Sequence, residues 1–146
     1  IQIKTSRSGA VQTGTTIVPF DDTIPQQSSD GDEYFTQAIT PTSVCNLLRA
    51  RVQIVVAYSV PSGNTAALFQ DSTEDALKAH WFSGPAGFSS PMNFDYHKLA
   101  ATVSSTTFKV KAGGSTAGTM TVNGQTSARK FGGVLESLLE VSEIMA

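Results

Sequence analysis

Side chains that could perform catalysis are scattered through this 146-residue chain and follow no known catalytic spacing. The only histidines are His80 and His97, and no Gly-x-Ser-x-Gly motif marks a serine nucleophile. Hydrolysis of a glycosidic bond needs two carboxyl groups across a cleft, but no spacing singles out a pair among the acidic residues of the middle of the chain. These are Asp71, Glu74, Asp75 and Asp95. The sequence therefore predicts neither an enzyme nor a cofactor.

Acidic side chains also gather in one polar segment, residues 21–33. Calcium prefers oxygen ligands from flexible loops, so Asp30, Asp32 and Glu33, together with Asp21 and Asp22, are the candidates for a metal site. The EF-hand spacing is absent, however, and surface loops are commonly acidic. We therefore expect solvated carboxylates and no bound metal.

Aromatic residues are concentrated in residues 78–97, around a loop that contains glycine and proline. Aromatic rings stack on the apolar C–H faces of sugars, and Trp and Tyr add a polar group that can bond to hydroxyls. The candidate ligand-binding residues are Trp81, Phe82, Phe88, Tyr96 and His97. The alternative is that Trp81 and Phe82 pack against the protein itself or against a neighbouring subunit.

The composition narrows the class of protein. Charged residues make up 15% of the chain, against about 25% in typical domains, and the net charge of −2 gives no basic field to attract nucleic acid or an anionic membrane. No apolar run approaches the roughly 18 residues of a spanning helix, so we expect no membrane insertion. The single cysteine, Cys45, excludes an internal disulfide and is expected to be a small buried side chain. Because the chain opens on Ile1, we expect it to be a piece of a longer protein.

Most segments alternate apolar and polar residues with a period of two, as strands do. The strongest signal is "NLLRARVQIVVAYS", residues 46–59, in which every second residue from Leu48 to Tyr58 must face the core. Further strands are predicted in residues 1–5, near 15–20, and in 34–40, 65–71, 92–101, 106–112 and 116–122. Because turns recur every 8–12 residues, the sequence predicts one all-β domain, an antiparallel β-sandwich or jelly roll.

Three segments carry turn or helix signals. Residues 72–82 could begin with a helical turn, since Ser72 and Asp75 loosely resemble a capping box, or could form a strand. Asn123-Gly124 is a two-residue hairpin signal, because both positions tolerate a positive φ. The last segment, "VLESLLEVSEIMA", fits helical and strand spacing equally well on local grounds.

Five stretches in one order resemble the C-terminal head domain of phage and prophage tail-fibre-like proteins and of trimeric adhesins derived from tail fibres. They cover roughly residues 11–145 and read "TTIVPFDDTIPQ", "YFTQAITPTSVCNLLRARVQI", "AALFQDSTEDAL", "TTFKVKAGGSTAGTMTVNGQTSARKFGG" and "LLEVSEI". The resemblance implies a C1q/TNF-like jelly roll, a homotrimer, and a strand rather than a helix at the C-terminus. It carries no catalytic residues.

The resemblance further implies an extracellular place, on a virion tail fibre or a bacterial surface fibre, of which residues 1–146 would be the C-terminal head. The expected partners are other copies of the chain and a bacterial surface glycan or protein receptor. Two alternatives stay open: a purely structural module that trimerises or caps a fibre, and an envelope-polysaccharide hydrolase.

Overall fold

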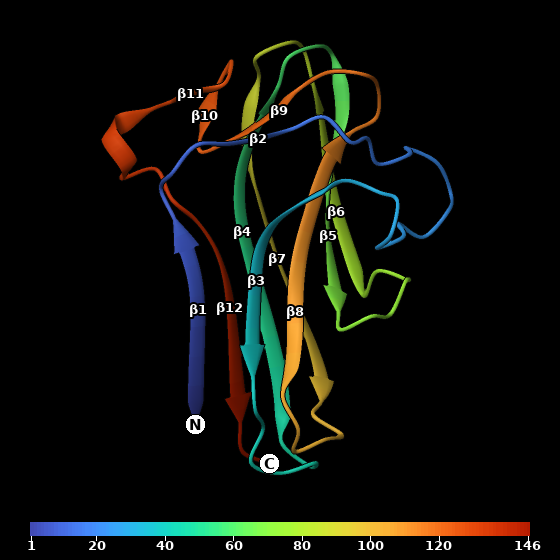
Figure 1. The fold of residues 1–146 in the computed structure, drawn as a ribbon, viewed down its shortest axis with the longest axis vertical. Helices are drawn as coiled ribbons and strands as arrows, with labels where there is room; N and C mark the ends of the chain where they lie inside the picture. Colours follow the sequence, from blue (N-terminus) through green and yellow to red (C-terminus); the bar gives the residue numbers. More distant parts are fainter.

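The computed structural model describes residues 1–146 and contains twelve β-strands, one 3₁₀ turn and no α-helix (Figure 1). Ten of the strands form two antiparallel sheets. The first sheet runs β1 (Gln2–Ser8), β12 (Ser137–Ile144), β4 (Leu47–Tyr58) and β7 (Ser89–Leu99), with β9 (Met120–Val122) and β2 (Gln12–Gly14) beside the end of β4. The second sheet runs β3 (Asp32–Ile39), β8 (Thr106–Gly114), β5 (Ser62–Gln70) and β6 (Lys78–Gly84). The remaining elements are the hairpin β10 (Gly124–Gln125) and β11 (Ala128–Arg129), and the 3₁₀ turn Phe131–Gly133.

Neighbouring strands in both sheets come from distant parts of the chain. Strand β12 lies between β1 and β4, and β8 lies between β3 and β5, so the chain crosses repeatedly from one sheet to the other. This connectivity is that of a jelly roll, and it confirms the predicted all-β sandwich. The structure contains no helix long and apolar enough to cross a bilayer.

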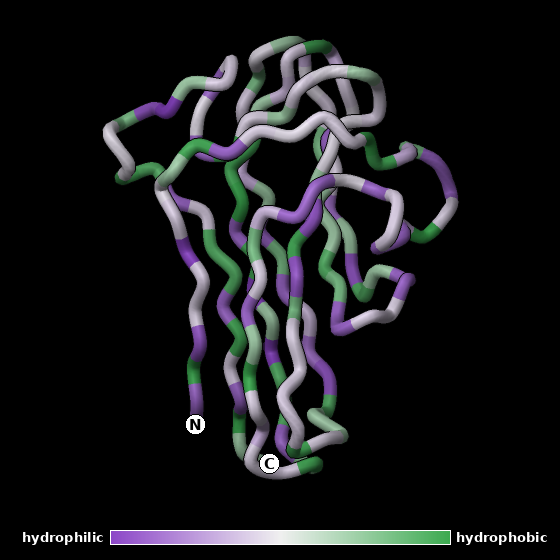
Figure 2. Tube along the Cα trace, in the orientation of Figure 1, coloured by the Kyte–Doolittle hydropathy of each residue, from purple (hydrophilic) through white to green (hydrophobic).

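Strand β4 forms the centre of the first sheet and confirms the strongest sequence pattern. It pairs with β7 along one edge and with β12 and β9 along the other. Its inward residues are all buried, and they are Leu48, Ala50, Val52, Ile54, Val56 and Tyr58. Hydrophobic and hydrophilic positions alternate along many of the strands (Figure 2). In β4 this alternation in residue type runs from Arg49 to Ile54, and the later outward residues, Val55 and Ala57, are apolar. Burial of such side chains, each contributing about 1.5–3 kcal/mol relative to exposure, supplies the main driving force for the sandwich.

The core between the two sheets comprises 21 buried residues. The second sheet contributes Leu68 from β5 and Phe108 and Val110 from β8, while β7 contributes Met92 and Phe94. The strands predicted in residues 92–101 and 106–112 are therefore confirmed as parts of β7 and β8.

The outer face of the second sheet is covered as well, because all nine residues of β5 are buried. Phe69 points away from the core, on the opposite side of β5 from Leu68, yet it is fully buried. Two loops, residues 15–31 and 71–77, are joined over this region by backbone hydrogen bonds from Gln27 to Glu74 (2.8 Å) and from Ala76 to Pro25 (3.0 Å). In the view of Figure 1 these loops extend beside β5 and β6.

One carboxylate lies inside the sandwich. Glu143 on β12 is 2% exposed and accepts hydrogen bonds from the Thr42 backbone N–H (2.7 Å), the Asn46 side-chain amide (2.8 Å) and the Gln2 side-chain amide (3.0 Å). The Asn46 amide and then the Thr42 N–H hold the pKa of Glu143 down to about 2. Glu143 therefore stays ionised and ties β12 to the loop before β4.

Asn123 fixes the path of the chain after β9. Its φ of 61° lies in the left-handed region, which asparagine tolerates better than most residues. Its side-chain amide donates to the carbonyl oxygens of Ser8 (2.8 Å) and Ala10 (3.0 Å), and its Oδ1 accepts from the Ser137 hydroxyl (2.6 Å). Asn123 thus ties β9 to the ends of β1 and β12.

The structure corrects two predicted turns. Asn123-Gly124 is not a hairpin turn; the hairpin turns at Thr126 and Ser127, whose φ values are 52° and 61°. The strand predicted near residues 15–20 is absent, because β2 ends at Gly14 and the following residues belong to the loop that covers the second sheet. Tertiary contacts of this loop, rather than its own apolar pattern, set its conformation.

Three further expectations are decided by the tertiary structure. Cys45 is exposed rather than buried, because it lies in the loop before β4 and not in a strand. Residues 78–84 form strand β6, with no helical turn before it. The C-terminal segment is strand β12, as the resemblance implied, since its burial between β1 and β4 outweighs its local helical spacing.

Candidate functional site

The aromatic segment of residues 78–97 is divided between the two faces of β6 and the hairpin that follows. Trp81 pairs with Thr65 of β5 and lies on the outer face of the second sheet, whereas Phe82 packs against the core from the other face. The reason is the two-residue period of a strand, which sends adjacent side chains to opposite faces. The structure therefore separates residues that the sequence placed in one group.

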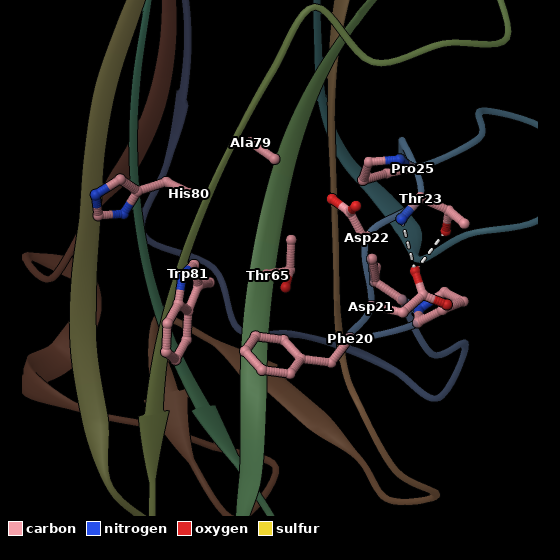
Figure 3. Close-up of a pocket in the computed structure, with 11 residues that line it drawn as sticks. Phe20, Asp21, Asp22, Thr23, Pro25, Thr65, Ala79, His80 and Trp81 are labelled. Carbon is pink, nitrogen blue, oxygen red and sulfur yellow. Dashed lines mark hydrogen bonds between the residues drawn. The ribbon is translucent and has the colours of Figure 1, made fainter.

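Trp81 forms one wall of a groove with a residue that the sequence analysis did not single out. The ring of Phe20, from the loop of residues 15–31, meets the Trp81 indole edge-on at a centroid distance of 4.7 Å (Figure 3). Both rings stay about half exposed, at 51% for Phe20 and 53% for Trp81. The groove has a volume of about 360 Å³ and is lined by Val18, Pro19, Phe20, Asp21, Asp22, Thr23, Pro25, Thr65, Ala79, His80 and Trp81.

The groove is acidic. Asp21 accepts hydrogen bonds from the Thr23 hydroxyl (2.5 Å) and the Thr23 backbone N–H (2.9 Å), and these bonds lower the pKa of Asp21. The carboxylate of Asp22 has no hydrogen bond or ion pair within the chain and lies on the side of the groove that the loop forms (Figure 3). No lysine or arginine lines the groove. The arrangement offers two aromatic rings, two carboxylates and the Thr65 hydroxyl to a ligand.

The other predicted site residues lie outside this groove. Phe82 and Phe88 pack against each other at the hairpin between β6 and β7, with a centroid distance of 5.9 Å. Tyr96 is half-buried against the core. His97 lies on the outer face of the first sheet, where its Nε2 is 3.6 Å from Asp95 Oδ2.

Neither histidine belongs to a nucleophilic arrangement. His80 lines the edge of the groove, but its ring points to the other side of β6 and stacks on Phe94 at 6.1 Å (Figure 3). Among the hydrogen bonds of the chain, none joins His80 or His97 to a serine.

The acidic loop does not assemble a metal site. Asp30 accepts from the Gln26 backbone N–H (2.8 Å), while Asp32 accepts from the backbone N–H and hydroxyl of Thr16 (both 3.0 Å). Glu33 is exposed on β3. No three acidic, histidine or cysteine side chains are grouped closely enough to hold an ion, because these carboxylates organise their own loop.

A second surface with polar chemistry is the outer face of the first sheet. Arg49 faces Asp95 (3.5 Å) and Arg51 faces Glu140 (3.6 Å), and the Nε atom of each arginine is buried without a hydrogen bond in the chain. A shallow depression of about 450 Å³ lies beside Arg51. Charges of both signs therefore occupy the middle of this face.

The same face ends in an apolar row near the two termini. Leu47 of β4 pairs with Leu99 of β7 and Ile144 of β12, so the three side chains lie side by side. Leu99 is 60% exposed, and Ile1 and Ile3 at the edge are also exposed. This end of the face leaves apolar surface uncovered in a single copy.

Sequence reasoning found Trp81 but missed Phe20 and Asp22. Phe20 follows Pro19 in a segment that was expected to be a strand, and nothing in its spacing connects it to β6. The acidic run of residues 21–33 includes Asp22, but the sequence interprets that run only as a candidate metal site and not as part of a ligand-binding groove.

Comparisons with known proteins define the fold. No family model and no curated protein sequence matches the chain. Among solved structures, Eiger TNF from S. frugiperda aligns over 99% of this chain and 93% of its own, with 9% identity and a TM-score of 0.54. A C-terminal domain described as EclA, a sugar-binding protein, aligns over 80% of this chain and 76% of its own, with 12% identity and a TM-score of 0.45. The first alignment shows that the chain has a TNF-like jelly-roll fold.

Proposed function

We propose that the protein is a non-catalytic, homotrimeric head domain that recognises a cell-surface glycan at the tip of an extracellular fibre. The observation that carries this proposal is the groove in which Trp81 and Phe20 keep half of their ring surface exposed beside two carboxylates. A large aromatic ring left in water loses about 1.5–3 kcal/mol of possible burial. A sugar ring stacked on Trp81 recovers part of that free energy, and its hydroxyls meet Asp21, Asp22 and Thr65.

The groove is also held in shape before any ligand arrives. The loop that carries Phe20 is bonded to the loop of residues 71–77 and to the sheet below it, where Val18 donates to the Gly114 carbonyl (3.0 Å). A preorganised site avoids the free-energy cost of ordering a loop on binding. This rigidity supports recognition rather than a merely structural part for the loop.

Homotrimer formation is supported by the outer face of the first sheet. Its exposed apolar row is a feature that contacts with another copy would cover. Three copies on one axis would present three grooves, and linked binding of weak sites raises affinity by about 10²–10⁴.

The test of the recognition function is a glycan array probed with wild-type protein and with Trp81→Ala. We expect binding to a restricted set of glycans and its loss in the variant. Phe131→Ala is the control, because Phe131 is an aromatic residue that is 76% exposed and lies outside the groove. Binding that survives Trp81→Ala would refute the groove, and the absence of binding by every protein would refute glycan recognition.

The structural alternative is a module that only trimerises or caps a fibre. The one observation that favours it is the exposed apolar row on the outer face of the first sheet. Leu99→Arg separates assembly from recognition, since Leu99 is exposed and its replacement leaves the core intact. Light scattering at micromolar concentration should report a trimer for the wild type and a monomer for Leu99→Arg. A wild-type monomer would contradict the assembly part of the proposal. A trimer without any glycan ligand would support the structural alternative.

A further inference from the structure

We infer that the groove beside Trp81 selects sugars that carry a protonated amine. The inference rests on the proposed function, because it names the class of glycan that the same groove would bind. It starts from the charge of the lining: two carboxylates, Asp21 and Asp22, and no lysine or arginine.

The carboxylates of the groove are available as anions. Asp21 is kept ionised by the two hydrogen bonds from Thr23, which lower its pKa. Asp22 is exposed and has no hydrogen bond or salt bridge in the chain, so its oxygens are free to accept from a ligand. A bond between a carboxylate and an ammonium group is roughly twice as strong as one between neutral groups.

The aromatic wall favours the same ligand. A cation over the face of a tryptophan ring within about 6 Å is attracted by the ring, with a contribution of about 0.5–1 kcal/mol at an exposed site. Trp81 stands across the groove from the acidic segment (Figure 3). An amino sugar would therefore meet an aromatic face on one side and a carboxylate on the other.

The surroundings reinforce the negative potential. Glu74 and Asp75 lie in the adjoining loop, where Glu74 accepts from Ser28 and Asp75 accepts from Gln26. The nearby lysines keep their positive charge, because Lys109 and Lys78 are bonded to neutral acceptors, the Gln27 side chain and the Asp95 carbonyl, but neither lysine lines the groove. A sugar acid or phosphate would meet repulsion here, unlike at the mixed-charge depression beside Arg51.

The chain provides its own probe, since Trp81 is its only tryptophan. Intrinsic fluorescence should be titrated with β-1,4-glucosamine oligomers and with the fully N-acetylated oligomers of the same length, below the pKa of the free amine. We expect the glucosamine oligomer to bind at least about tenfold more tightly in dilute buffer. The ratio should fall as salt is raised to about 0.5 M, because salt screens exposed charges.

Two matched variants test the role of charge. Asp22→Asn should bring the ratio of the two oligomers' affinities toward one. Glu33→Gln removes the same charge from an exposed residue of β3 and should leave that ratio unchanged. A ratio that persists in Asp22→Asn would overturn the inference. Equal or tighter binding of the acetylated oligomer would also overturn it, yet would leave glycan recognition intact.

Two further outcomes are decisive. If neither oligomer changes the fluorescence, the amine selection is refuted, and the glycan array then decides separately whether the groove binds sugars at all. If a lysine-rich peptide of equal charge competes as well as the glucosamine oligomer, the groove selects cations in general, and the assignment to sugars is overturned.

Discussion

Replacement of Phe69 by alanine tests whether the groove depends on a small apolar layer outside the main core. Phe69 is fully buried although its side chain points away from the space between the sheets. The loops of residues 15–31 and 71–77 are bonded to each other, and Gln27 accepts a hydrogen bond from Lys109, the residue that pairs with Phe69, so we expect these loops to cover Phe69. We therefore expect the loop that carries Phe20 and Asp22 to pack against Phe69.

The size of the effect follows from the burial. Truncation of a buried phenylalanine to alanine costs about 3–5 kcal/mol when the cavity persists. We expect the lower end of that range, about 3 kcal/mol, because loops can partly collapse onto the space. For a domain near 150 residues this loss corresponds to a decrease in Tm on the order of 10 °C.

The assay combines urea unfolding, native-state hydrogen exchange and tryptophan fluorescence. Phe69→Ala should speed exchange in residues 15–31 and shift the emission of folded Trp81, because Phe20 would leave its ring. Leu68→Ala is the matched control: it is the next residue on the same strand, equally buried, and points into the core. It should lower stability by about 2–5 kcal/mol without a selective change in the loop or in Trp81 emission.

The reasoning would be refuted by either of two results. A loss of stability below about 1 kcal/mol in Phe69→Ala would mean that the residue is not packed as its burial indicates. If hydrogen exchange in residues 15–31 and the emission of Trp81 both equal those of the wild type, Phe69 does not hold the loop in place.

Three other perturbations test polar features of the fold. The pKa of Glu143 falls from 4.5 to about 2 on folding. The ionised carboxylate therefore stabilises the fold fully above pH 4.5, and this stabilisation is lost as the pH falls toward 2. Thermal melts of the wild type should show Tm falling with pH in this range, and those of Glu143→Gln should not show this contribution. Asn123→Ala should destabilise more than Asn123→Gly, by about 1 kcal/mol in urea melts, because both lose the side-chain bonds but only alanine is strained at positive φ; equal losses would contradict this reading. Replacing the turn residues, Thr126→Asn with Ser127→Gly, should raise stability by roughly 1 kcal/mol, since both sites have positive φ; a lower Tm would show that the native turn side chains matter more than the backbone.

The candidate site shows where sequence reasoning reaches its limit. Trp81 was found because aromatic residues are rare enough in this chain for a cluster to stand out. Phe82, Phe88 and Tyr96 were grouped with it by proximity in sequence, but strand alternation turned them toward the core or the hairpin. The true neighbour, Phe20, comes from a loop whose position has no periodic signal.

The sequence by itself determined the sandwich and its core. The alternation of Leu48 to Tyr58, and of the residues around Phe94 and Phe108, is local information, because a strand with a two-residue period has one dry face whatever its neighbours are. Many such strands with turns between them indicated a sandwich or a jelly roll, and the resemblance to tail-fibre head domains implied the jelly roll.

Only the tertiary structure decided the groove, the burial of Glu143 and the exposure of Cys45. Each depends on which distant segment covers a residue, and loop segments carry no repeating pattern that encodes their partner. The chain had to close into two sheets before Phe20 could meet Trp81, and before donors from three residues could surround one buried carboxylate.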